Sequence, residues 1–503
     1  MRFKKILIAL GILFGLYAIA TYFYFSAEPL SLEHCPITIP GQAPILLQNP
    51  NYPDHQFKTI NDASCLNETR VYDVLTIKTV DDIYQALKLA REKKLHIAIA
   101  GRRHSMGGQS FFKDALVLDM MHFNRIIALD EEKKIITVES GATWHQIQLY
   151  LHPKNLAVKA MQSTDIFTVG GSLAVNAHGM DHTIGSMIST VKSFTIMLAD
   201  GSIRRITPEQ PELFDAVIGG YGLFGIILEV ELEVTDNVMY ERDTTILNYH
   251  DFPEFFEKIT QEKTYGLFYA HLSTSPLSFF KDMIIYGYKK IEHEGPFKPL
   301  GKISLINLRR FLINLSKRRH YAQVFKWIAE KYIDPAIDKL RTKNLVSRNE
   351  IMHDSVEYLE NVLINETDIL HEYFIPHKNF IPYIDQMRTI LKNSKIPVLN
   401  ASIRIINKES NMLNYAPEDM FAIVLYLNQR VDTESLQAMK KLTSDLIDLT
   451  LKFDGTFFLP YQLHYTREQL QKAYPNINTF FALKRKYDPS LLFMNNFYAK
   501  YAQ

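Results

Sequence analysis

A glycine-rich loop that contains a histidine offers the first chemistry along this sequence. Residues 101–109 read Gly-Arg-Arg-His-Ser-Met-Gly-Gly-Gln and follow a short apolar stretch. Because glycine tolerates positive φ, consecutive backbone N–H groups of such a loop can point into one concavity and bind a pyrophosphate. Arg102 or Arg103 can add positive charge there. Ser105 can add a hydroxyl donor, and His104 a ring nitrogen that can bond to a cofactor. Taken alone, the loop is equally well explained as a glycine-rich turn with an incidental histidine.

A second run of small residues, 168–179, reads Thr-Val-Gly-Gly-Ser-Leu-Ala-Val-Asn-Ala-His-Gly and also permits close approach of the backbone to a ligand. Tight packing of a strand against a helix would require the same residues. His178 and His182 are four apart, which is the spacing of a metal-binding pair on one helix face. Gly179 interrupts such a helix and no third ligand is evident, so we predict no metal site.

Two further motifs fail for lack of context. Residues 220–225 match G-x-G-x-x-G, but nucleotide binding by that motif requires a strand before it and a helix after it. Here residues 211–218 read as a helix and 226–234 as a strand, so we reject a Rossmann site. Residues 295–302 resemble a P-loop, but with one residue too many and without the Ser or Thr that should follow.

The elements that position these loops are short strands and helices without a regular βαβ rhythm, which indicates an α+β fold. Apolar periodicity and capping residues define them. We expect helices at 79–94, from 143 onward, at 321–333, 354–363 and 433–453, and strands at 95–100, 115–119, 134–139, 191–198, 226–234, 421–427 and 457–459.

Composition excludes some classes of function. The 503 residues are 47% hydrophobic and carry a formal net charge of +1, so no global charge attracts nucleic acid. We expect no nucleic-acid partner. The segment 309–343 is locally basic and could lie on an anionic membrane surface, although a solvated helical face explains it as well.

The N-terminus predicts a membrane anchor at residues 1–27. The uncharged run 6–25 follows three basic residues and is long enough to span a bilayer as a helix. The positive-inside rule then leaves the rest of the chain on the non-cytoplasmic side. A cleavable signal peptide is the alternative. Prolines make 28–70 an extended connector, and Cys35 and Cys65 are either joined in a disulfide or free.

Taken together and in this order, the motifs resemble FAD-linked oxidases of the vanillyl-alcohol oxidase type, which have a PCMH-type FAD-binding domain. That group is similar in fold to sugar-lactone oxidases, alditol oxidases, cytokinin dehydrogenases and decaprenylphosphoryl-ribose oxidase. The matching stretches are 77–79, 101–109, 116–120, 138–144, 168–179, 219–227 and, near the end, 481–495. The resemblance covers residues 71–236 well and residues 238–470 only in scattered places.

The resemblance implies an FAD-binding domain at 71–237, a substrate (cap) domain with an antiparallel sheet flanked by helices at 238–470, and a segment at 471–503 that returns to the FAD domain. His104 matches the histidine that often carries FAD through its 8α-methyl group. No cysteine follows Cys65, which excludes a second covalent bond through a downstream cysteine. The expected cofactor-binding residues are Gly101, Arg102, Arg103, His104, Ser105, Gln109, Thr168, Gly170, Gly171, Ser172, Asn176, Gly179 and Ile227.

The resemblance gives less guidance on the substrate side. Arg404 matches an arginine that faces substrate in polyol and lactone oxidases, but the acid that usually precedes it is absent. Tyr461, Gln462 and His464 lie where relatives place a lysine or histidine against the flavin, and His464 could accept a proton near neutral pH. Asp165 resembles the base of cytokinin dehydrogenases.

The expected activity is oxidation of a hydroxylated substrate, such as a sugar lactone or polyol, by hydride transfer to flavin N5, with oxygen or another acceptor taking the electrons. Three alternatives remain open. They are oxidation of a lipid-linked or lipid-like substrate at the membrane, a cytokinin-type amine dehydrogenase, and a non-catalytic flavin-binding scaffold tethered to the membrane.

Overall fold

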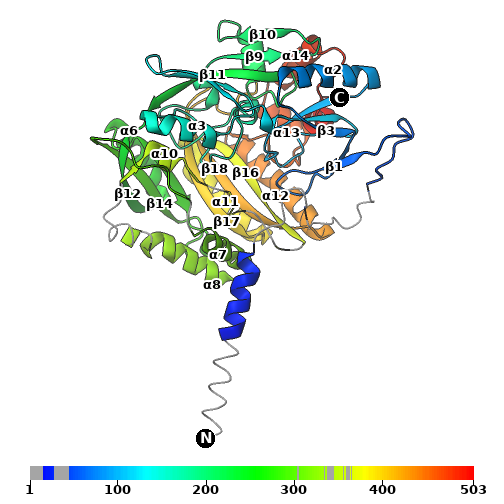
Figure 1. The fold of residues 1–503 in the computed structure, drawn as a ribbon. Coiled ribbons are helices and arrows are strands. Elements are labelled where there is room, and N and C mark those ends of the chain that lie inside the picture. The colour runs from blue at the N-terminus through cyan, green and yellow to red at the C-terminus, as the bar shows by residue number, and fades with distance from the viewer. Residues whose placement is uncertain are drawn as a thin grey trace.

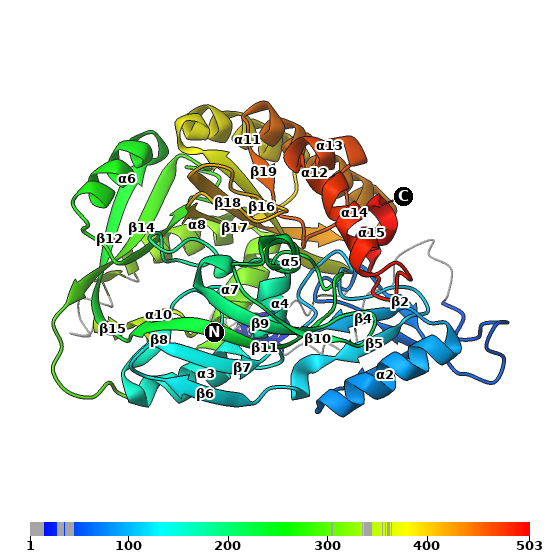
Figure 2. The same ribbon diagram turned by 90° about the horizontal axis from the view of Figure 1, so that it is seen from above.

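The computed structural model confirms an α+β architecture built on four sheets (Figures 1 and 2). Two of them hold the glycine-rich segments, and a third, of eight strands, lies beside them. The described residues are 15–27, 35, 45–302, 305–333, 335–336, 345–354, 356–357, 359, 363 and 365–502.

The first sheet is parallel, with strand order β3-β5-β4. Its strands are β3 (Asp73–Thr76), β5 (Leu116–Asp119) and β4 (Ile97–Ala100). Helix α2 (Val80–Lys93) connects β3 to β4 and buries Ile83, Leu87 and Ala90, the face expected from the sequence. Thr79 caps this helix in a capping box with Asp82. Strand β4 ends at Ala100, directly before the loop that begins at Gly101.

The second sheet is antiparallel, with order β10-β9-β11-β7-β6, and β8 pairs with β11. Its strands are β6 (Ile126–Asp130), β7 (Ile135–Glu139), β8 (Leu156–Val158), β9 (Val191–Met197), β10 (Ile203–Ile206) and β11 (Ile226–Asp236). Helices α3 (Trp144–Leu151), α4 (Val169–Ala174) and α5 (Pro211–Val217) connect them. The strands expected at 134–139, 191–198 and 226–234 are confirmed to within two residues.

The third sheet has eight antiparallel strands in the order β15-β12-β14-β13-β17-β18-β16-β19. They are β12 (Met239–Asn248), β13 (Leu267–Leu272), β14 (Asp282–Ile291), β15 (Leu345–Ser347), β16 (Glu366–Pro376), β17 (Val398–Ile406), β18 (Met420–Arg430) and β19 (Thr456–Phe457). Helices α6 (Phe252–Gln261), α11 (Phe380–Ser394) and α12 (Thr433–Lys452) lie along it (Figure 2). Phe421 on β18 contacts both Phe252 of α6 and Phe380 of α11, so these two helices share one face of the sheet.

The remaining helices of this region are α7 (Ile306–Arg318), α8 (His320–Ile328) and α10 (Arg348–Ile351). Trp327 of α8 is buried against β12, β13 and β14. A helix at residues 15–26 projects from the molecule beside α7 (Figure 1). Among the described residues, no helix is both long and apolar enough to cross a bilayer. Residues 6–14 of the expected span lie outside the described part.

The C-terminal residues pack on the first sheet. After α13 (Arg467–Ala473) and α14 (Ile477–Tyr487), Phe493 forms a parallel bridge with Ile97 of β4. Asn495 then donates its side-chain amide to the carbonyl of Tyr221, and α15 (Asn496–Tyr501) closes the chain.

Two local expectations need correction. We expect a helix at residues 354–363, but residues 356, 357, 359 and 363 lie in bends and turns, and the other residues from 355 to 362 lie outside the described part. The strand expected at 457–459 ends at Phe457, where a turn through Pro460 begins. The cysteines are joined in a Cys35–Cys65 disulfide near the short pair β1 (Lys58–Ile60) and β2 (Thr69–Val71).

Candidate functional site

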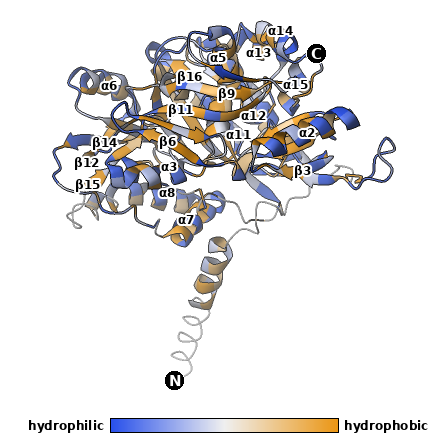
Figure 3. Cartoon of the chain, turned by 45° about the horizontal axis from the view of Figure 1, so that its top comes forward, coloured by the Kyte–Doolittle hydropathy of each residue, from blue (hydrophilic) through white to orange (hydrophobic). Residues whose placement is uncertain are grey.

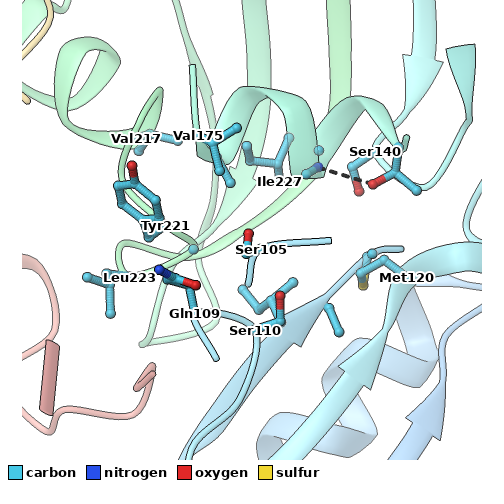
Figure 4. A pocket seen from close by; sticks show the side chains of 18 of the residues that line it. Ser105, Gln109, Ser110, Met120, Ser140, Val175, Val217, Tyr221, Leu223 and Ile227 are labelled. Atoms are coloured by element: carbon cyan, nitrogen blue, oxygen red, sulfur yellow. Dashed lines mark hydrogen bonds between the residues drawn. The ribbon is translucent and has the colours of Figure 1, made fainter. Parts of the chain in front are cut away.

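A pocket lies where the first two sheets meet (Figure 4). Its walls come from the loop after β4, the start of α4, and the turn between α5 and β11. The lining residues are Ile99, Ala100, Gly101, Ser105, Gln109, Ser110, Met120, Ser140, Thr168, Gly170, Gly171, Ala174, Val175, Val217, Tyr221, Gly222, Leu223, Phe224, Gly225 and Ile227.

Small residues let two of these walls approach each other. A Cβ atom at Gly101 would lie 2.3 Å from the Oγ1 atom of Thr168, a separation that atoms cannot adopt. Thr168 caps α4 by accepting a hydrogen bond from the N–H of Gly171, and the N–H of Gly170 donates to the carbonyl of Ser140 over 2.7 Å. The two runs of small residues found in the sequence therefore face one pocket from opposite sides.

The G-x-G-x-x-G segment forms the third wall. Helix α5 precedes it and strand β11 follows it, so the inverted context expected from the sequence is confirmed and a Rossmann turn is excluded. Residues 221–225 nevertheless line the pocket. Gly225 has a φ of 155°, and a Cβ atom there would lie 2.5 Å from the carbonyl oxygen of Met197. Our expectations included Ile227 but missed Tyr221 and its neighbours, although the glycines of this segment pointed to them.

His104 lies in the loop after β4 but is not among the residues that line the pocket. Its Nε2 atom is buried and has no hydrogen-bond partner. Burial, followed by the charges of Arg102 and Arg103, lowers the pKa of His104 to about 4, so its imidazole is neutral at physiological pH. The ring packs edge-on against Phe167, with 5.1 Å between centroids. A neutral, buried nitrogen without a partner is a group that a ligand could satisfy.

Five other expected cofactor residues do not line the pocket and instead support its walls. Ser172 is buried and hydrogen-bonds to Gln162 and to the carbonyl of Thr168, because its hydroxyl faces the inside of the domain. Asn176 donates to Glu409, and Gly179 lies tightly against the carbonyl of Met161.

The two arginines of the loop also do not line the pocket. The Nε of Arg102 donates to the carbonyl of Ile166 over 3.2 Å, away from the pocket. Arg103 adopts a φ of 57°, and its carbonyl accepts a hydrogen bond from the N–H of Ala63. Both arginines therefore hold the loop in place, and their charge also depresses the pKa of His104.

The segment that follows β19 is fastened to the same loop. The N–H of Met106 donates to the carbonyl of Pro460 over 2.8 Å, and the side chain of Gln109 donates to the carbonyl of Leu459 over 2.8 Å. The amide of Gln462 returns a hydrogen bond to the carbonyl of Met106. These bonds place Tyr461 beside the pocket and give Gln462 a positioning role.

Tyr461 begins a buried polar chain of three residues. Its hydroxyl donates to the Oε2 of Glu372 over 3.3 Å, and the Oε1 of Glu372 lies 2.6 Å from the Nε2 of His178. Glu372 and His178 are both buried. Burial, and next the charge of Glu372, raises the pKa of Tyr461 well above its usual value, and Tyr221 of the pocket lies close enough to contribute. Tyr461 therefore keeps its proton and shares it with Glu372.

The sequence alone did not indicate that Tyr461, Glu372 and His178 are joined by hydrogen bonds. Glu372 is nearly 200 residues from His178 and lies in β16, which also contains Glu366, Asp368 and His371. A buried charge needs a partner, but with three carboxylates in one strand the sequence does not show which of them pairs with His178. His178 was considered only as a metal ligand, but it bonds to Glu372 instead.

Of the other residues expected to act on substrate, Arg404 lies close to Tyr461. Its positive charge acts on the pKa of Tyr461, and its Nε is buried without a hydrogen-bond partner. His464 turns away toward α12, where its Nδ1 lies 3.2 Å from the hydroxyl of Thr443. Burial lowers the pKa of His464 to about 4, which makes it a poor proton acceptor near neutral pH.

Asp165 does not line the pocket. Its carboxylate bonds to two histidine side chains. The Nδ1 atoms of His145 and His353 lie 2.8 and 2.6 Å from its Oδ2. These three side chains are close enough together to hold a metal ion. Both distances have the length of a hydrogen bond to one shared oxygen. The hydrogen bond to Asp165 raises the pKa of His353.

Comparisons with known proteins show an FAD-binding region and several related oxidoreductases. The family described as "FAD binding domain" matches residues 73–207. Decaprenylphosphoryl-β-D-ribose oxidase of Mycolicibacterium smegmatis is 34% identical over 169 residues, which are 33% of this chain and 37% of the relative. L-gulonolactone oxidase of Mus musculus is 28% identical over 31% of this chain and 35% of the relative. Cytokinin dehydrogenase 3 of Arabidopsis thaliana is 23% identical over 83% of this chain and 84% of the relative.

The chain matches little more than a third of the length of the first two relatives, so these matches describe the FAD-binding region and not the whole protein. The pocket fits the cofactor. Small residues leave room for a backbone-bound pyrophosphate, Ser105 and Ser110 supply hydroxyls, and the unpartnered Nε2 of His104 lies in the same loop. Residues 73–207 therefore match an FAD-binding domain, and the chain is similar to FAD-linked oxidases and dehydrogenases.

Proposed function

We propose that this protein is an FAD-dependent oxidoreductase that oxidises a hydroxylated substrate, such as a sugar lactone or a polyol. The observation that carries the proposal is the buried chain Tyr461–Glu372–His178 beside the FAD pocket. Two relatives support the substrate class, since they are oxidases named for a decaprenylphosphoryl ribose and for a gulonolactone. When bound, FAD supplies the acceptor for the hydride that leaves the substrate carbon, at its N5 atom.

The protein's own residues remove the proton of the substrate hydroxyl group. The hydroxyl of Tyr461 donates to Glu372, so its oxygen has a free lone pair for the proton of a substrate hydroxyl. As that proton arrives on Tyr461, the proton of Tyr461 passes to Glu372, and the bond to His178 holds Glu372 in place. The positive charge of Arg404 stabilises the negative charge that develops on the substrate oxygen. The substrate thus loses one hydride and one proton.

We propose further that His104 binds FAD covalently through the 8α-methyl group. Three features support this. The Nε2 of His104 is buried without a partner, its pKa is lowered to about 4, and it lies in the loop whose Gly101 and Ser105 line the pocket. A neutral imidazole nitrogen has the lone pair that such a bond requires. A second bond through cysteine is excluded, because the only cysteines form the Cys35–Cys65 disulfide.

Acid precipitation tests the covalent bond. The flavin of the native protein should stay in the pellet, and peptide mapping should find the mass of FAD on the peptide that contains His104. His104→Ala should bind FAD that acid releases. Complete release from the native protein would contradict the covalent bond but not the pocket.

A substrate panel tests the activity. Sugar lactones, polyols, polyprenyl phosphosugars and cytokinin-like amines are each added without oxygen, and bleaching of the flavin absorbance is followed. The proposal predicts bleaching by a hydroxylated substrate. Bleaching by amines alone would favour the cytokinin type of reaction. A flavoprotein that no compound bleaches would contradict the enzyme and favour a flavin-binding scaffold.

A further inference from the structure

Helix α7 presents its polar side to the interior of the protein. Its fully buried residues are Arg310, Asn314, Ser316 and Lys317, whereas none of its leucines is fully buried. A surface helix of a soluble protein normally has the opposite arrangement, with the apolar stripe facing the core. Both the buried polar side and the outward apolar side of the helix therefore need an explanation.

The inner side of α7 binds the end of the N-terminal helix. Arg310 donates to the carbonyls of Ser26 and Ala27 over 3.3 and 3.4 Å, and Asn314 donates to the carbonyl of Phe25 over 2.9 Å. These are the carbonyls that a helix leaves without partners at its C-terminus. Lys317, one turn farther along, forms a buried ion pair with Asp368 of β16. The polar face of α7 thus joins the N-terminal helix to the large sheet.

The outer side of α7 is consequently apolar. At 100° per residue, positions 308, 312 and 315 lie opposite positions 310, 314 and 317, and all three are leucines. Leu308 is 41% exposed and Leu305, just before the helix, is 63% exposed. Figure 3 shows hydrophobic residues on α7 and on the N-terminal helix at the same end of the molecule.

Helix α8 continues this apolar surface. Trp327 and Ala322 are buried toward the sheet, and Lys326 and Glu330 form an ion pair on that side. The outward positions are Tyr321, Phe325, Ile328 and, in the turn that follows, Tyr332, which are 66%, 51%, 43% and 58% exposed. Their spacing of four, three and four residues places them in one stripe.

Positive charge and aromatic rings border the same surface. Arg309, Arg318 and Arg319 are exposed between the leucines of α7 and the stripe of α8, and Arg309 and Arg318 form ion pairs with Asp354 and Glu366. Exposed apolar residues with neighbouring cations and tyrosines are typical of a segment that lies in the interface of an anionic bilayer. A second copy of the chain would bring these cations against one another. The apolar N-terminal helix, held at its end by α7, projects from this same end of the molecule (Figure 1).

We propose that the outward faces of α7 and α8 form a docking surface for an anionic lipid bilayer, which these faces enter to the depth of the headgroups beside the N-terminal helix. The proposal does not depend on the oxidoreductase activity. Docking through these faces holds the end of the sheet that carries α7 and α8 against the membrane. The hydrogen bonds of Arg310 and Asn314 to the N-terminal helix set the orientation.

Site-specific labelling of the full chain tests this surface with a matched pair of isoleucines. Ile328 on α8 and Ile203 on β10 are 43% and 44% exposed and lie at opposite ends of the molecule (Figure 1). Ile328→Cys and Ile203→Cys are each labelled with an environment-sensitive fluorophore, while the native cysteines remain in their disulfide. Vesicles of phosphatidylcholine with phosphatidylglycerol are then added, binding is checked by flotation, and acrylamide quenching is measured. Unchanged circular dichroism confirms that both variants fold.

The proposal predicts a blue shift and several-fold weaker acrylamide quenching for the label at 328, and no change for the label at 203. A label at 328 that remains fully accessible on vesicle-bound protein would overturn it, as would protein that does not bind the anionic vesicles. A shift at 328 that depends on protein concentration without vesicles would assign the surface to a second copy and would also overturn it. None of these outcomes affects flavin bleaching, so the proposed activity is judged separately.

Discussion

Replacing Tyr461 with phenylalanine removes one hydroxyl group and leaves the rest of the site intact. That hydroxyl bonds to Glu372 over 3.3 Å, at the long limit of a hydrogen bond, so its loss should cost the fold only about 1 kcal/mol. If the hydroxyl passes the substrate proton to Glu372, its removal should slow substrate oxidation by about 10²–10⁴-fold. At 1.36 kcal/mol per factor of ten, this corresponds to a barrier higher by about 3–5 kcal/mol.

The assay is the rate of flavin bleaching at saturating substrate without oxygen, corrected for flavin content. Tyr465→Phe is the matched control, because Tyr465 is a buried tyrosine four residues away whose hydroxyl has no hydrogen-bond partner. We expect this control to bleach at the native rate. If Tyr461→Phe also bleaches at the native rate with a normal flavin content, Tyr461 is not in the proton path and the mechanism proposed above is wrong.

Three further predictions follow from buried groups. Glu372→Gln should slow bleaching by about 10²-fold or more without loss of flavin, since an amide cannot take up the proton; unaltered bleaching would argue against a relay. Burial raises the pKa of Glu409 from 4.5 to about 7, so its charged form weakens the fold as pH rises through this range. Glu409→Gln, which keeps an acceptor for Asn176, should therefore be more stable than the native protein at pH 8 by up to about 3 kcal/mol, and not at pH 4, as measured by urea unfolding. The pKa of His353 is raised by Asp165, so its stabilising effect is complete below the unfolded-state pKa and is lost as pH rises through the folded-state pKa. His353→Gln should therefore cost more stability at pH 6 than at pH 9, and equal costs would contradict that pairing.

Local patterns predicted the helices and strands of the first two sheets well. The capping residue Thr79 and the apolar face of residues 80–93 identified α2, and short apolar runs identified strands of the first two sheets. Glycines at 101 and 170 indicated where the backbone approaches a ligand, because close approach leaves no room for a side chain. These signals are local, so a single sequence contains them.

The substrate side depends on contacts between distant residues. The role proposed for Glu372 depends on its hydrogen bonds to His178 and Tyr461, which lie in other parts of the chain. No spacing along the sequence indicates that these three residues are in contact. The same holds for Asp165, which hydrogen-bonds to His145 and His353 from other segments. The burial of the polar side of α7 could not be predicted either, because this side hydrogen-bonds to the distant N-terminal helix.

The flavin content of the purified native chain tests the central claim most directly. We expect a yellow protein with one FAD per chain, because Gly101, Gly170 and Gly171 line a single pocket where the backbone can approach a cofactor. A folded but colourless protein that takes up no FAD when the cofactor is added would contradict the account.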